Sequence, residues 1–81
     1  MKALVYSVAA IKALKSLPQR DAEKLRDKLA AYAAGENAGL DVSALKGSSY
    51  SRLRHGDWRA VFEETKTEVF VIAIAHRREV Y

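Results

Sequence analysis

The spacing of apolar residues changes from helical to alternating near the middle of the chain. Before that point, residues 2–6 form a short apolar run that predicts a strand. Val8, Ile11 and Leu14 follow at a spacing that places them on one face of a helix. Ser7 precedes them, and serine is a favoured N-cap because its hydroxyl accepts a hydrogen bond from a first-turn N–H. We therefore expect a strand and then a helix that begins after Ser7.

A second helix is predicted from about residue 18 or 19 to residue 34. Pro18 separates it from the first helix, because proline is tolerated in the first turn of a helix but not in its interior. Asp21 and Glu23 lie near its start, where negative charge interacts favourably with the helix dipole. Gly35 is typical of the position that follows a helix. The helix carries an apolar stripe formed by Ala22, Leu25, Leu29, Tyr32 and Ala33.

Beyond the second helix the apolar positions alternate, which is the period of a strand. Connections of hairpin length separate the alternating segments, so neighbouring strands are expected to pair antiparallel. The last segment is apolar on both faces, as expected of a central strand. We expect strands near residues 42–45, 50–55, 58–64 and 68–75.

Together these elements predict one α+β domain over residues 1–81, with an N-terminal strand, a two-helix hairpin and a mainly antiparallel sheet. We expect the helices to cover one face of the sheet only. A neighbouring chain or a partner would then cover part of the other face. A domain this small buries only about 60% of its unfolded surface, so a partner would also add stability.

Composition excludes several classes of protein. The chain has no cysteine, so it holds neither a disulfide framework nor a thiolate metal site, and a reducing cytoplasm fits. Its N-terminal apolar stretch is too short for a signal peptide. No run approaches the ~20 residues of a membrane span. We expect a cytoplasmic protein without membrane contact.

The net charge of +4 is concentrated in two segments, residues 46–59 and residues 76–81. Basic residues there outnumber the acidic ones, which are Asp57 and Glu79. If the two segments meet in space, the imbalance would attract a polyanion, although an ordinary solvated surface is the alternative. The basic residues are Lys46, Arg52, Arg54, Arg59, Arg77 and Arg78.

The predicted hairpin gathers several of these arginines. Alternation places Tyr50, Arg52 and Arg54 on one face of their strand. Arg59 projects from the next strand, and we expect it to lie near Arg52 across the hairpin. Like charges at such positions are destabilising, and a bound anion would offset the repulsion. If the last strand pairs beside Arg59, the C-terminal segment also ends near the arginines.

These residue types suit metal-free cleavage of RNA, in which the ribose 2′-hydroxyl attacks the neighbouring phosphate. The reaction requires stabilised negative charge on phosphorus, which arginine supplies, and protonation of the departing 5′ oxygen by histidine or tyrosine. Arginine is a poor general base, so proton removal falls to His76, to His55 or to positioning of the hydroxyl alone. Two histidines without cysteine or carboxylate partners at ligand spacing predict no metal and no cofactor.

Four segments carry a resemblance that extends over nearly the whole chain. The first is Tyr6-Ser7 followed by Ile11-Lys12-Ala13-Leu14, and the others are residues 45–47, 50–62 and 76–81, the last reading His-Arg-Arg-Glu-Val-Tyr. In combination and order they resemble the RelE/ParE superfamily of toxins from type II toxin–antitoxin systems, and within it the RelE-like branch. The resemblance implies a β-α-α-β-β-β fold, binding in the ribosomal A site, endonucleolytic cleavage of the mRNA codon there, and neutralisation by a cognate antitoxin.

The resemblance also implies roles for individual residues. Arg59 matches the arginine that holds the scissile phosphate, and Arg52 matches a basic residue that activates or orients the nucleophile. Arg77 and Tyr81 match a C-terminal arginine and tyrosine that act on transition-state charge and on the leaving group or a stacked base. The chain departs from the family at Tyr50, where a prototypical member has lysine, and this leaves the general base open.

Residue pattern and resemblance together define the predicted site. A histidine near the C-terminus serves as acid or base in some relatives, which adds His76. His55 adjoins a Gly-Asp turn, and a solvent-exposed turn residue is its alternative reading. Trp58 and Phe62 are expected in the core, and Asp57 is expected to shape its turn or to orient an arginine. The predicted catalytic residues are Arg52, Arg59, His76, Arg77 and Tyr81, and the predicted RNA contacts are Lys46, Arg54, His55 and Arg78.

Two other functions stay open. ParE-like toxins share the fold, poison DNA gyrase by binding it and lack the catalytic basic set, whereas Arg52, Arg59 and the C-terminal ending favour the nuclease branch. A catalytically silent member would bind only its antitoxin. The expected partners are a cognate antitoxin, the ribosome with mRNA in its A site, and operator DNA only through the antitoxin complex.

Overall fold

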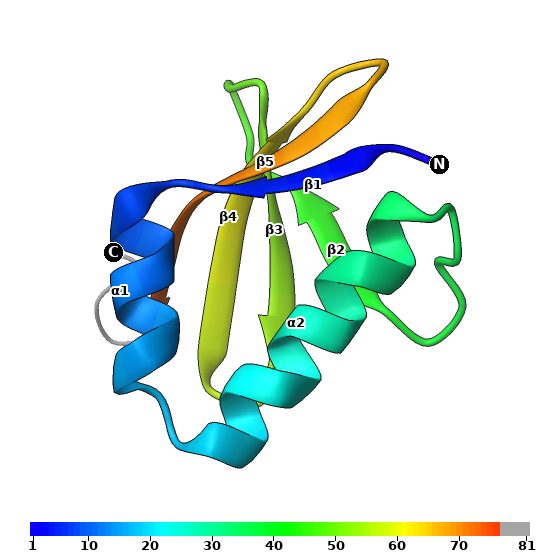
Figure 1. Ribbon diagram of the computed structural model, residues 1–81. Helices are drawn as coiled ribbons and strands as arrows, with labels where there is room; N and C mark the ends of the chain where they lie inside the picture. Colours follow the sequence, from blue (N-terminus) through cyan, green and yellow to red (C-terminus); the bar gives the residue numbers. More distant parts are fainter. Residues whose placement is uncertain (77–81) are drawn as a thin grey trace.

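The protein is described here by a computed structural model of residues 1–76 (Figure 1). Arg77, Arg78 and Tyr81, which the sequence places in the site, lie outside the described residues. The chain forms β1 (Ala3–Tyr6), α1 (Val8–Ser16), α2 (Gln19–Ala33), β2 (Asp41–Ala44), β3 (Tyr50–His55), β4 (Trp58–Glu64) and β5 (Glu68–His76). The predicted α+β class, with its N-terminal strand, helix pair and strand-rich second half, is confirmed.

The five strands form one sheet in the order β1-β5-β4-β3-β2. β1 runs parallel to β5, and the other three pairs are antiparallel. The sheet twists so far that β1 crosses β3 and β4 in Figure 1. Compared with the β-α-α-β-β-β order, there is one additional strand, because Asp41–Ala44 pairs with β3 as an edge strand. Within residues 1–76, no helix has the length and apolar character that a membrane crossing requires.

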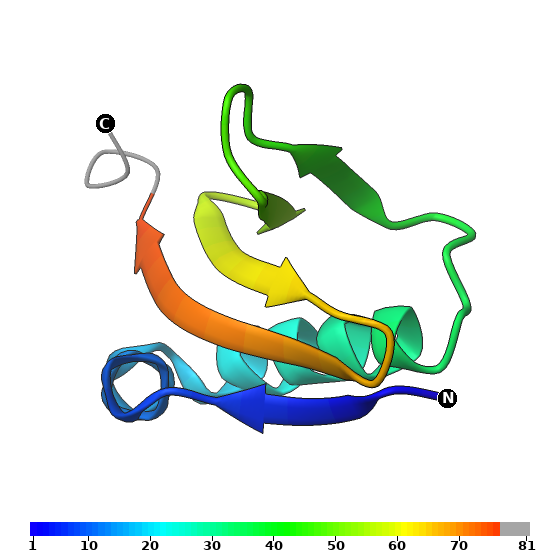
Figure 2. The same ribbon diagram turned by 90° about the horizontal axis from the view of Figure 1, so that it is seen from above.

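Both helices lie on one side of the sheet, as expected (Figure 2). The apolar stripe of α2 faces the sheet, and Leu25 and Leu29 are fully buried there. Phe62 of β4 is buried among them and contacts the Tyr32 ring, with 5.1 Å between ring centroids. Burial of each large apolar side chain contributes about 1.5–3 kcal/mol, so this layer holds the domain together. The sheet contributes Leu53, Ala60, Phe62, Val69, Val71 and Ile74 to the core.

Ser7 joins the start of α1 to the middle of the sheet. Its Oγ accepts a hydrogen bond from the Ala10 backbone N–H at 3.0 Å, so it is the predicted N-cap. The same hydroxyl donates to the Ile72 carbonyl at 2.8 Å. β5 has an irregularity there, because Val61 pairs with Ala73 and the next residue of β4 already pairs with Val71. Ser7 therefore stabilises the helix and occupies a carbonyl at the bulge.

A second polar cluster joins the N-terminal strand, the end of α2 and the end of β4. Lys2 Nζ and Tyr32 Oη each donate to the Glu64 carboxylate, at 2.6 Å in both cases. Burial of the phenol, followed by its bond to Glu64, raises the pKa of Tyr32 to about 12. The hydrogen bond from Lys2 lowers the pKa of Glu64. The cluster thus favours neutral tyrosine beside ionised glutamate.

Candidate functional site

The sheet face opposite the helices carries three rows of side chains, each running across several strands. Alternation defines this open face, because the residues between its members belong to the buried core. Successive rows are about 7 Å apart along a strand. The turn row is Asp41, Arg54, Arg59 and Ala75; the middle row is Ser43, Arg52, Val61 and Ala73; the lower row is Tyr50, Glu63, Phe70 and Val5.

The turn row places two arginines side by side. Arg54 pairs directly with Arg59 across the β3–β4 hairpin, and Arg52 pairs with Val61. Arg52 is therefore a diagonal neighbour of Arg59 across the hairpin, and Arg54 is its direct partner. The two-residue turn at Gly56 and Asp57 sets this register, and Gly56 adopts a φ of +55° that favours glycine. All three arginines nevertheless share the open face, as predicted.

Arg59 is held by the turn that precedes it. Its Nη1 donates to the carbonyl of Gly56 at 2.9 Å and to the carbonyl of Trp58 at 3.2 Å. Only 6% of the residue is exposed. Within residues 1–76, Nε and Nη2 have no hydrogen-bond partner. A fixed guanidinium shielded from water interacts more strongly with an anion than a solvated one does.

Arg54 and Arg52 are more accessible than Arg59. The side chain of Arg54 is 53% exposed, and its Nε lies 3.9 Å from Oδ2 of Asp41, which is also exposed. Such a surface ion pair contributes little to stability, so Arg54 can exchange its carboxylate for a phosphate at low cost. Arg52 is half-buried one row below. Together the three residues present positive charge along β3 and across to β4.

The structure places His55 on the other face of the sheet. Its Nε2 lies 3.3 Å from Oδ1 of Asp21, which belongs to the first turn of α2. Only 15% of the histidine side chain is exposed, so the expectation of a solvent-exposed turn residue was wrong. The pattern gave no sign of this contact, because Asp21 is 34 residues distant in sequence. His55 therefore lies apart from the arginines.

His76 is the last residue of β5, and it lies at the same end of the strands as the turn row. It pairs with Trp58, and the two rings meet edge to face with 5.3 Å between centroids. Its Nε2 lies 3.9 Å from Oδ2 of Asp57. The prediction that β5 pairs beside Arg59 is confirmed, since Ala75 lies opposite Arg59. His76 itself shares the face of Trp58 and His55, so its side chain starts from the face opposite the arginines, one residue beyond the turn row.

The remaining predictions have mixed outcomes. Lys46 is exposed in the connection between β2 and β3, at the opposite end of β3 from the turn row. Phe62 belongs to the core, and Trp58 packs partly buried against it, as predicted. Asp57 lies in the two-residue turn that it was expected to shape, and its Oδ2 lies 3.9 Å from Nε2 of His76.

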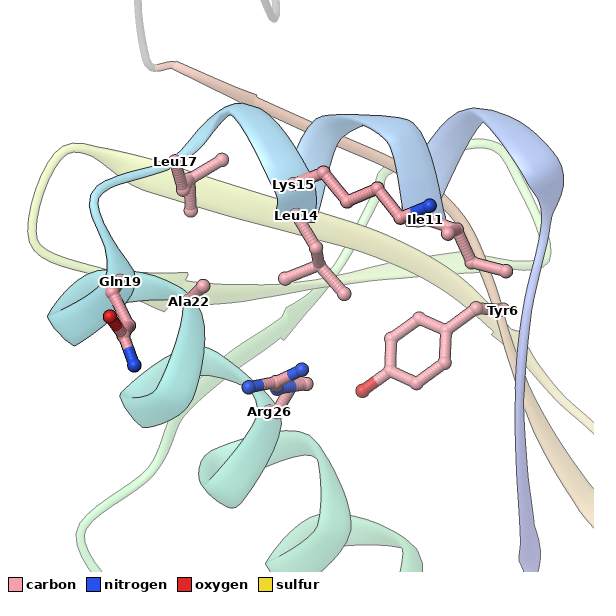
Figure 3. A pocket seen from close by; sticks show the side chains of 8 residues that line it. All are labelled: Tyr6, Ile11, Leu14, Lys15, Leu17, Gln19, Ala22 and Arg26. Atoms are coloured by element: carbon pink, nitrogen blue, oxygen red, sulfur yellow. The ribbon is translucent and has the colours of Figure 1, made fainter.

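A groove of about 420 Å³ lies between the two helices, away from the arginines (Figure 3). Ile11 and Leu14 of α1 face Ala22 of α2 across it. The hydroxyl of Tyr6 points into the groove and, within residues 1–76, has no hydrogen-bond partner. Burial raises the pKa of Tyr6, and nearby Arg26 partly opposes this shift. The groove thus combines an apolar lining with an unpaired hydroxyl and the cations of Lys15 and Arg26.

Solved structures share this fold. A chain of the RelB–RelE antitoxin–toxin complex from Methanococcus jannaschii is 21% identical, with a TM-score of 0.81 over 95% of this chain and 94% of that one. YafQ from E. coli is 17% identical, with a TM-score of 0.76 over 100% and 99%. A chain of the RelE–RelB complex from Pyrococcus horikoshii is 23% identical, with a TM-score of 0.74 over 98% of both chains. No curated protein matches the chain.

The chain therefore shares the fold of the RelE and YafQ toxins. The family model for the ParE toxin of the type II toxin–antitoxin system parDE matches residues 4–81. The chain belongs to this family and is the toxin of a type II toxin–antitoxin system.

Proposed function

We propose that this toxin arrests translation by cutting mRNA in the ribosomal A site, without a metal. The observation that carries the proposal is the turn row, where Arg54 and Arg59 lie directly opposite each other on the sheet face that neither helix covers. A protein gains nothing in stability from two facing arginines, whereas a phosphate between them would neutralise both. Arg52 adds a third cation in the next row.

In this mechanism Arg54 and Arg59 hold the scissile phosphate. The ribose 2′-hydroxyl attacks phosphorus, and the arginines stabilise the negative charge that develops on the phosphate oxygens. The bond to the 5′ oxygen breaks, which leaves a 2′,3′-cyclic phosphate on one product and, after protonation, a 5′-hydroxyl on the other. Arg52 orients the attacking hydroxyl but stays protonated and removes no proton.

Proton transfer is assigned to residues at the end of β5. His76 directly follows Ala75, which lies opposite Arg59, so it lies one residue beyond the turn row, with its side chain on the face of Trp58. We propose His76 as acid or base, with Arg77 and Tyr81 supplying charge stabilisation and leaving-group protonation. Lys46 and Arg78 would contact RNA beyond the scissile site. His55 is not included, because only 15% of its side chain is exposed and its Nε2 lies 3.3 Å from Asp21 of α2, whereas 30% of the His76 side chain is exposed.

A cognate antitoxin is the proposed protein partner, since several structural neighbours were solved as toxin–antitoxin complexes. We propose that one antitoxin segment occupies the groove between α1 and α2. Its apolar side would cover Ile11 and the neighbouring exposed Val8, and its acidic residues would pair with Lys15 and Arg26. The toxin would reach operator DNA only through this complex.

A second candidate function is poisoning of DNA gyrase, which the match to the ParE family model favours. It requires a binding surface but no reacting groups. Under this alternative, the turn row would bind protein or DNA, and its arginines would be replaceable by lysine with little loss, because a point charge would suffice. Cleavage through a fixed guanidinium would instead require arginine at position 59.

Induced expression in a bacterial host tests the proposal. We expect the wild-type protein to arrest growth and to generate new 5′ ends within the coding regions of translated messages. The Arg59→Ala and Arg59→Lys variants should do neither, while Arg20→Ala, an exposed change at the start of α2, should behave as wild type. Growth arrest with intact messages and inhibited supercoiling would instead assign the protein to gyrase.

A further inference from the structure

The lower row of the open face differs in chemistry from the two rows above it. It places Tyr50, Glu63, Phe70 and Val5 side by side across four strands. Tyr50 and Val5 are each 37% exposed, so aromatic and aliphatic surface is open here beside a carboxylate. The proposed cleavage uses none of these side chains, although they lie on the same face as the arginines.

Tyr50 lies where a nucleobase of bound RNA would arrive. It precedes Arg52 on the same face of β3, about 7 Å away along the strand. If Arg52 contacts a phosphate or its ribose, the base attached to that nucleotide extends beyond the cationic rows. Aromatic side chains bind unpaired bases by stacking, and stacking tolerates every base. Tyr50 therefore accounts for binding but not for selection.

Glu63 adds the selective group. Ser49 Oγ donates to its Oε2 at 2.9 Å, which fixes the carboxylate beside Tyr50. Within residues 1–76, Oε1 accepts no hydrogen bond. An ionised carboxylate accepts but does not donate, so it pairs with a base amino group and repels a base carbonyl. Phe70 flanks Glu63 on the other side and reduces its access to water.

We propose that the lower row is a nucleobase subsite that selects bases bearing an exocyclic amino group against uracil. Tyr50 stacks on the base, and Glu63 Oε1 accepts the hydrogen bond from its amino group. Cytosine and uracil make the sharpest comparison, because they are alike in size but carry an amino group and a carbonyl at the same ring position. The inference rests on the proposed function only in taking RNA as the ligand of this face.

Binding of non-cleavable RNA tests the subsite separately from catalysis. Fluorescence anisotropy would compare the full chain with 2′-O-methyl oligocytidine and oligouridine of equal length at low salt. We expect oligocytidine to bind about three- to tenfold more tightly. Glu63→Gln should remove the preference, because the amide can donate to the uracil carbonyl. Glu36→Gln, which removes one charge from an exposed loop, should retain it.

Tyr50 variants separate stacking from selection. Tyr50→Ala should weaken binding of both oligonucleotides by a similar factor, whereas Tyr50→Phe should retain both affinities and the preference. The side chains of Tyr50 and Glu63 lie outside the core, so the urea midpoint of unfolding should be unchanged in the Tyr50 and Glu63 variants. Equal affinity of the wild-type protein for the two oligonucleotides, or a preference that survives Glu63→Gln, would overturn the proposal.

The outcomes also distinguish this inference from the proposed function. If messages stay uncut while the cytosine preference holds and depends on Glu63, the nuclease proposal fails and the subsite stands. If messages are cut but no variant changes the preference, the subsite fails and the nuclease stands. If Tyr50→Ala binds RNA normally, the lower row belongs to a protein contact, which also overturns the subsite.

Discussion

The two faces of the sheet differ in how their side chains interact. On the helix-covered face, Phe62 and Val71 are fully buried within one apolar core. On the open face, Arg54 and Arg59 oppose each other, and their nearest carboxylate partner is a weak contact from Asp41. The first arrangement is explained by folding stability alone. The second is not, so the open face indicates where a ligand binds.

The largest effect should come from the covered face. Phe62→Ala removes a fully buried ring from between α2 and the sheet and should lower the free energy of unfolding by about 3–5 kcal/mol. Phe70→Ala, one strand away on the open face, should cost about 1 kcal/mol or less. Urea titrations followed by circular dichroism would compare the two. Equal losses would contradict the division of the sheet into a structural and a functional face.

Arg59 should show the reverse pattern. Arg59→Ala should reduce the rate of RNA cleavage by about 10²–10³-fold, because it removes a fixed donor to the developing charge. Its effect on stability should be about 1 kcal/mol, the value of its bonds to the turn carbonyls. Single-turnover cleavage and urea unfolding on the same preparation would separate these effects. If Arg59→Ala loses stability but its folded fraction cleaves RNA at the wild-type rate, Arg59 has a structural role and not a catalytic one.

Ser7 tests the connection between helix and bulge. Ser7→Ala loses both the N-cap bond to Ala10 and the bond to the Ile72 carbonyl, and we expect a loss of about 1–2 kcal/mol in stability. Ser16→Ala, which removes one exposed bond at the other end of α1, should change stability by less than about 0.5 kcal/mol. Thermal unfolding of both variants would measure the difference. An unchanged stability of Ser7→Ala would show that neither the start of α1 nor the bulge depends on the Ser7 hydroxyl.

The smallest effect concerns alkaline pH. Tyr32 has a pKa of about 12 in the fold, above its ordinary value of 10.0, so the folded state favours the protonated phenol. This contribution is complete below pH 10 and declines as the pH rises towards 12. Tyr32→Phe should therefore be less stable than wild type at neutral pH, and the gap should narrow at alkaline pH. Urea titrations of both proteins at neutral and at alkaline pH would measure this difference in stability. A difference that does not change with pH would contradict the role of the phenol.

Most of the fold could be predicted from sequence, because periodicity reports directly on local structure. The Ser7 cap, the stripe on α2 and the alternation of Tyr50, Arg52 and Arg54 were all correct. Register was harder to predict. The pairing of Arg59 depends on the length of a two-residue turn, and a shift of that turn moves each partner along the strand.

The site could be predicted only in part. The arginines cluster because they share one hairpin, and local spacing was sufficient to show this. The contacts of both histidines depend on segments that meet only in the folded chain: His55 reaches Asp21 of α2, and His76 reaches the turn at Asp57. The lower row has the same origin, since Val5 and Phe70 meet Tyr50 and Glu63 only through strand order.

The most direct test of the toxin as a nuclease uses purified protein, ribosomes and a synthetic message with a defined codon in the A site. We predict cleavage within that codon, a 2′,3′-cyclic phosphate on the upstream product, and loss of both with Arg59→Ala. An intact message, from a preparation that inhibits the supercoiling activity of gyrase, would contradict the account and assign the open face to a different target.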